Sequence, residues 1–117
     1  MANHSMEKNK IVLLPFPFDD FKQIKVRPAI CLTNVIGKHA HIVVAFISSK
    51  MPDEKLKSDV MIAKVQSSFK QTGLSVDSVI RLHKLVTIPK QIIKRELGSA
   101  DVKLANEIRK KLNDLFD

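Results

Sequence analysis

The sequence predicts a small, mainly β protein in which a strongly bent sheet or barrel is closed by helices near the C-terminus. Its 117 residues are enough for one domain with a buried core and too few for two. Short apolar runs rich in branched residues alternate with turn signals over most of the chain. A helical spacing of apolar residues appears only at the end. Five or six short strands followed by a terminal helix are therefore expected.

The expected strands follow the apolar runs. The first run ends at Pro15 and Pro17, which suits a strand that leaves the sheet at an edge. Gly37 lies in a turn over residues 34–38, and a second turn is expected at Gly73. The charged stretch from Met51 to Ser58 indicates a loop. The predicted strands are residues 11–16, 29–33, 42–48, 60–65 and 78–88.

Helices are expected after the last of these strands. Pro89 can open a short helix because its missing amide is not needed in the first turn. Gly98 can end that helix, and Ser99 can cap the next one. The next helix is indicated by apolar residues at helical spacing, namely Leu104, Ala105, Ile108, Leu112 and Leu115.

Charge and composition narrow the range of partners and compartments. The chain carries 20 Lys and Arg against 12 Asp and Glu, a formal net charge of +8, which attracts polyanions. No apolar run approaches the roughly 18 residues that span a bilayer, and no apolar signal segment opens the chain, so a cytoplasmic protein is expected. The single Cys31 excludes an intrachain disulfide. The opening MANHS before Met6 is interpreted as an expression scar, which leaves one domain over residues 6–117.

The stretch IKVRPAICLTN contains the first candidate site residue. No acidic residue occurs within six positions of Arg27 on either side. A distant carboxylate or an anionic ligand is therefore expected to balance its charge. Pro28 suits the first residue of a strand, where no ladder amide is required.

A metal site is not expected. The residues that would have to form it, His39, His41, His83 and Cys31, match no zinc signature in their spacing. Cys31 also lies in an apolar run, where a packed thiol is the simpler interpretation.

Four segments in order, IVLLPFPFDD, KVRPAICLTN, VVAFISS and DSVIRLHKLVTI, together with the closing helix, resemble the MazF/PemK family of toxins from type II toxin–antitoxin pairs. The resemblance runs from about Lys10 to Phe116, and its most specific part is Arg27-Pro28 with Asn34 after the strand. It implies an SH3-like barrel that forms a homodimer and cleaves single-stranded RNA, sequence-selectively and without a metal or other cofactor. It also implies an antitoxin whose acidic segment folds into the RNA groove.

The resemblance assigns roles to individual residues. Arg27 matches the catalytic arginine of the family, and its planar fork fits two phosphate oxygens. Ser48 stands where a threonine is common, and Ser49 is the alternative hydroxyl. Arg81 matches an arginine of one branch, and His83 stands where that branch has an aspartate acting as base. Both are predicted to share one face of their strand. A structural role for His83 at a strand edge is an equal alternative.

RNA contacts are expected from the loop after the first strand. Phe18 and Phe21 could stack on unpaired bases, whereas Phe16 is expected to pack in the core. Asp19 could accept hydrogen bonds from base edges, and Lys25 adds positive charge.

Two other functions remain open at this point. A toxin of related fold binds DNA gyrase and cleaves nothing, so the chain could be a protein-binding poison. A basic RNA-binding module without cleavage is the third possibility, and its binding would weaken steeply as salt rises.

Overall fold

A computed structural model of the chain describes residues 7–16 and 25–117, so the predicted scar at residues 1–5 lies outside the described part. Within it, strands and helices follow the order β1 Lys10–Phe16, β2 Lys25–Cys31, β3 His41–Ser48, β4 Asp59–Ile62, α1 Phe69–Thr72, β5 Ser78–Pro89, a 3₁₀ turn over Lys90–Ile92, β6 Arg95–Ser99 and α2 Val102–Leu115.

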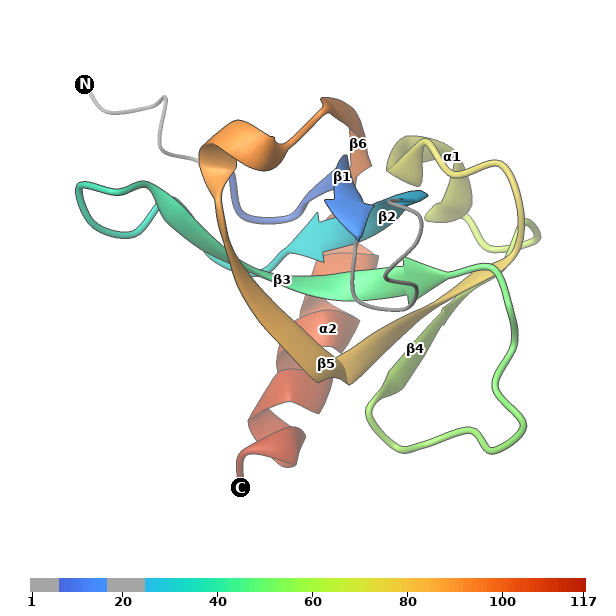
Figure 1. The fold of residues 1–117 in the computed structure, drawn as a ribbon. Helices are drawn as coiled ribbons and strands as arrows, with labels where there is room; N and C mark the ends of the chain where they lie inside the picture. Colours follow the sequence, from blue (N-terminus) through green and yellow to red (C-terminus); the bar gives the residue numbers. More distant parts are fainter. Residues whose placement is uncertain (1–6, 17–24) are drawn as a thin grey trace.

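The strands form one antiparallel sheet in the order β4-β5-β3-β2-β1-β6. The sheet curls into a half-barrel, and α2 lies against it (Figure 1). This confirms the predicted mainly β fold with a terminal helix. Among residues 7–16 and 25–117, no helix is long and apolar enough to cross a membrane.

Strand β5 bends strongly, and its pairing shows why (Figure 1). Ala45 of β3 lies opposite Leu85, but Ile47, two residues later, lies opposite Ile80. Three more residues are therefore accommodated on β5 than on β3, as in an extended bulge. The bend turns the first half of β5 toward β4, with which it pairs through residues 78–81.

Side chains alternate between two cores on opposite faces of the sheet. Along β1, Ile11 enters one core and Val12 the other, as the period of a strand requires. Leu104 and Ile108 of α2 complete the first core. The second core contains Phe16, which is buried as predicted, and it includes Cys31.

The C-terminal region corrects two predictions. Residues 89–98 do not form a helix, because after one 3₁₀ turn the chain becomes β6 and pairs with the edge of β1. This pairing provides hydrogen-bond partners for backbone N–H and C=O groups of β1, and the sequence pattern had not predicted these partners. The cap of α2 is Asp101 rather than Ser99: its carboxylate accepts hydrogen bonds from Leu104 N at 2.9 Å and from Ser68 Oγ at 2.8 Å.

The bounds of two strands also differ from prediction. Strand β2 begins at Lys25, so Pro28 lies inside it rather than at its first residue. Pairing of β2 with β3 starts only at Ala29, and at Pro28 the strand therefore has a neighbour on one side only. That is a position where proline is tolerated in a sheet. Strand β4 spans residues 59–62, not 60–65.

Candidate functional site

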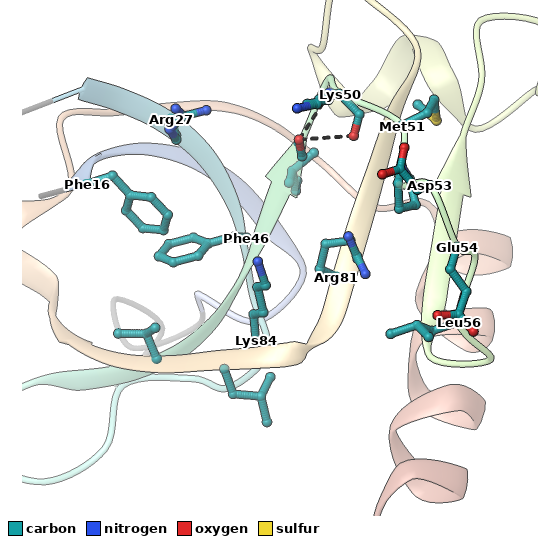
Figure 2. Close-up of a pocket in the computed structure, with 15 residues that line it drawn as sticks. Phe16, Arg27, Phe46, Lys50, Met51, Asp53, Glu54, Leu56, Arg81 and Lys84 are labelled. Carbon is teal, nitrogen blue, oxygen red and sulfur yellow. Dashed lines mark hydrogen bonds between the residues drawn. The ribbon is translucent and has the colours of Figure 1, made fainter. Parts of the chain in front are cut away.

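A cavity of about 640 Å³ opens between the end of β1, the start of β2, and the β3–β5 pair. Its apolar floor includes Phe16 and Phe46, whose rings meet edge to face at 79°. Figure 2 shows these rings on the same side of the cavity as Arg27, with the amino group of Lys84 next to Phe46. A cavity with an apolar floor and a charged rim suits a ligand that has both a flat ring and an anionic group.

Positive charge dominates the rim of the cavity. Its cations are Arg27, Lys50, Arg81 and Lys84, and its carboxylates are Asp53 and Glu54. Arg27 projects from β2 on one side, while Arg81 and the two carboxylates lie on the other (Figure 2). The amino group of Lys84 points from β5 toward Phe46, between these two sides. An anionic group in this cavity would therefore meet cations from three directions.

Ser48 also lines the cavity, at the end of β3. Its hydroxyl accepts a hydrogen bond from Lys50 N at 3.1 Å and donates one to Lys50 O at 3.3 Å. This local turn fixes the hydroxyl in place and orients the chain toward the loop over residues 49–58. Of the described residues, neither Ser49 nor Lys25 lines the cavity, and both are exposed.

Arg81 is held by a buried carboxylate. Its Nε donates to Asp59 Oδ1 at 2.7 Å, and this side chain of Asp59 is fully buried. The bond uses Nε and therefore leaves both Nη nitrogens available for other acceptors. Sequence reasoning missed Asp59, because it lies 22 residues before Arg81 and only the pairing of β4 with β5 brings the two together.

Of the pair Arg81 and His83, the structure places only Arg81 in the cavity lining. Both residues lie in the part of β5 that is opposite the irregular register at Ala45–Ile47 of β3. Arg81 and Lys84 line the cavity, whereas His83 is exposed and is not among the described lining residues. Lys84 is thus the second cation that β5 brings to the cavity. The bulge that places it has no signal in the sequence.

The remaining candidates fall outside the cavity or outside the described residues. Phe18, Asp19 and Phe21 belong to residues 17–24, which are not described. Cys31 is packed in the second core, and burial raises the pKa of its thiol to about 12, so the thiol is protonated at neutral pH. Over residues 7–16 and 25–117, no three His, Cys, Asp or Glu side chains come close enough to hold a metal ion.

Comparison with protein families gives a match over residues 7–116 to the PemK-like, MazF-like toxins of type II toxin–antitoxin systems. The chain belongs to this family. It is a toxin of the MazF/PemK type, as the four quoted segments predicted.

Solved structures show the same fold at low sequence identity. The toxin MazF-mt6 of Mycobacterium tuberculosis is 22% identical, with a TM-score of 0.69 over 92% of this chain and 96% of that one. A MazE–MazF crystal structure (Form-III) from Deinococcus radiodurans gives 0.71 at 17% identity, covering 96% of each chain. An endoribonuclease in complex with its cognate antitoxin, from a mycobacterial species, gives 0.69 at 12% identity over 93% and 92%. No curated protein matched the sequence.

Proposed function

We propose that this toxin is an endoribonuclease that cuts single-stranded RNA by attack of a 2'-hydroxyl on the adjacent phosphorus. The observation that carries the proposal is the cavity in which Arg27, Arg81 and Lys84 surround an apolar floor. In the transition state of this reaction negative charge grows on the phosphate oxygens, and fixed cations around them lower the barrier. The products would be a cyclic phosphate and a 5'-hydroxyl.

Each lining residue has a role in this chemistry. Arg27 presents a planar fork that can bind two phosphate oxygens at once. Ser48 can accept a hydrogen bond from the attacking hydroxyl while its turn is intact, or it can rotate its proton away from Lys50 O and donate it to the phosphate. The floor formed by Phe16 and Phe46 takes the ring of an unpaired base.

We assign the proton transfers of this reaction to side chains that line the cavity. Asp53 and Glu54 line the cavity opposite Arg27, and one of these carboxylates can take the proton of the 2'-hydroxyl as a general base. The leaving 5'-oxygen then takes up a proton, either from the carboxylic acid so formed or from the ammonium group of Lys84. His83 lies outside the described lining, so the acid or base role that the resemblance gives it is a separate proposal.

The same positive rim supports an antitoxin as a second ligand. Solved relatives include a MazE–MazF structure from Deinococcus radiodurans and an endoribonuclease with its cognate antitoxin. We propose that an acidic antitoxin segment enters this cavity and excludes RNA, since both ligands present anionic groups to the same cations. The homodimer implied by the resemblance and the cytoplasmic location expected from the sequence complete the proposal. Light scattering of the purified protein measures whether it is a dimer.

The deciding experiment incubates the protein, in EDTA, with a mixed-sequence RNA and with its 2'-deoxy counterpart. We expect cuts in the RNA alone, with cyclic phosphate ends, and a loss of at least about 100-fold in Arg27→Ala. Mapping of the new ends gives the recognition sequence. Cutting that EDTA abolishes would exclude the metal-independent reaction. Intact RNA would reject the nuclease and favour a gyrase-binding toxin, while salt-sensitive binding without cutting would indicate an RNA-binding module.

A further inference from the structure

Asp59 is a fully buried carboxylate at the first position of β4. Burial of a charge is costly unless hydrogen bonds and an opposite charge compensate it. Here Oδ1 accepts from Arg81 Nε at 2.7 Å, and Oδ2 accepts from Leu56 N at 2.9 Å. Both carboxylate oxygens are therefore occupied, each by a different segment of the chain.

The backbone of Asp59 makes further connections. Its N–H donates to Leu56 O at 3.0 Å, and its carbonyl accepts from Lys111 Nζ of α2 at 2.8 Å. Asp59 thus joins β5, the loop over residues 49–58 and α2 at a single point. Leu56 and Arg81, two of the groups joined here, both line the cavity.

The geometry points to Asp59 as a positioning residue for the proposed nuclease site. With Nε held by Asp59, the plane of the Arg81 guanidinium is fixed, and its Nη nitrogens remain to bind a phosphate oxygen. The same carboxylate anchors the loop that carries Asp53 and Glu54 along the cavity. This inference rests on the proposed RNA cleavage and assigns no direct contact between Asp59 and the substrate.

A purely structural role for Asp59 makes different predictions. If the pair only compensated a buried charge, any cation that reached Asp59 would serve, and Arg81→Lys would cleave RNA normally. If Asp59 orients Arg81 for catalysis, its removal should have no further effect once the guanidinium is gone. A double-mutant cycle separates the two cases.

The experiment compares Asp59→Asn, Arg81→Gln, the double variant and Arg81→Lys in single-turnover cleavage of an RNA that the wild type cuts. We expect Asp59→Asn to lower the maximal single-turnover rate constant about 10- to 100-fold, while the enzyme concentration at half-maximal rate changes less than about threefold. The double variant should match Arg81→Gln alone. Arg81→Lys keeps a charge for Asp59 but loses the Nη nitrogens, and it should also lose at least about 10-fold.

Controls make each outcome decisive. Asp77→Asn alters a carboxylate that likewise accepts a backbone N–H, from Lys64 at 2.7 Å, but does not line the cavity, and it should cleave like the wild type. Far-UV circular dichroism checks that each variant is folded. If Asp59→Asn does not fold, Asp59→Glu takes its place in the cycle, since it keeps the buried charge but shifts the carboxylate by one methylene relative to Arg81 Nε.

Additive losses in the double variant, or normal cleavage by Arg81→Lys, would overturn the positioning role while leaving the nuclease intact. Wild-type protein that cuts no RNA would overturn both proposals.

Discussion

Charged side chains gather in two regions of the molecule. At the first, which we call the β6 edge, Glu7 contacts Lys90 at 3.1 Å and Lys10 at 3.4 Å, and Lys10 also contacts Glu96 at 3.5 Å. Two carboxylates there face two ammonium groups. Around the cavity of about 640 Å³, the lining has four cations and two carboxylates, and one of the cations, Arg81, is paired with the buried Asp59; one positive charge is left in surplus.

The difference shows how charge in a small basic protein is divided between folding and binding. At the β6 edge the charges lie within ion-pair distance and compensate one another, and Leu97, the residue after Glu96, packs against the turn at Gly73. At the cavity the surplus positive charge lies around open space, so an external anion can compensate it. Substitutions at the β6 edge should therefore change stability, and those at the cavity should change RNA cleavage.

The largest effect is expected from Gly73→Ala, where the turn after α1 packs on β6. Gly73 has φ of 76°, and a Cβ there would overlap the carbonyl oxygen of Leu97. A left-handed backbone and a clash with main-chain atoms together should lower the free energy of unfolding by on the order of 3 kcal/mol. Denaturant titration measures this loss of unfolding free energy. RNA cleavage per folded molecule should be unchanged.

Gly37→Ala is the matched control for this variant. Gly37 also has a positive φ, 71°, but open space surrounds the position of its Cβ. Only the backbone cost of about 1 kcal/mol should remain. Equal losses in the two variants would show that Leu97 moves aside and that the β6 edge is less rigid than its packing indicates.

Local signals in the sequence predicted most of the fold. The apolar runs, the turn at Gly37 and the helical spacing after Leu104 all depend on neighbouring residues, and the structure confirms each of them. The sequence did not predict strand β6, because this strand forms by pairing with the edge of β1, which lies more than 80 residues earlier in the chain. Tertiary pairing there overrode a plausible local helix.

The candidate site was predictable to a smaller extent. The strand-two motif led to Arg27, and the resemblance led to Ser48 and Arg81; the structure places all three around one cavity, while their catalytic roles stay predictions. Lys84 and Asp59 could not be found in this way. The first depends on a bulge that changes which side chain faces the cavity, and the second on a pairing between β4 and β5.

Lys84→Gln tests the cavity with a smaller expected effect. Loss of one cation from the proposed phosphate site should lower RNA cleavage about 10-fold. It should also reduce the slope of log affinity against log salt for a 2'-deoxy oligonucleotide by about 0.7. Lys10→Gln, which removes a cation from the β6 edge, should change neither quantity.

His83→Gln completes this test, because His83 is the neighbour of Lys84 that the bulge leaves outside the described lining. We expect a smaller loss than in Lys84→Gln. A loss of roughly 100-fold would instead assign a proton-transfer role to His83, as the family resemblance implies. The cavity would then have to include residues beyond those that line it here.

The smallest effect is expected from the acid titration of Glu7, whose side chain is 11% exposed. Burial raises the pKa of Glu7, but hydrogen bonds and charge from Lys90 and Lys10 outweigh it and leave the pKa below its ordinary value of 4.5. The folded state then holds this proton less tightly than the unfolded chain does. The stabilisation is complete above about pH 4.5 and is lost as the pH falls through the lowered pKa.

Glu7→Gln isolates this contribution from that of Asp101, whose pKa is also lowered, by hydrogen bonds from Leu104 N and Ser68. Above about pH 5 the variant should be less stable than the wild type by on the order of 1 kcal/mol. Because glutamine does not titrate, this gap in stability should close as the pH falls through the lowered pKa of Glu7, while cleavage at neutral pH stays at the wild-type rate. A gap that persists at low pH would mean that packing of the Glu7 side chain, rather than its charge, stabilises the β6 edge. Reduced cleavage would mean that the two charged regions are coupled through the sheet.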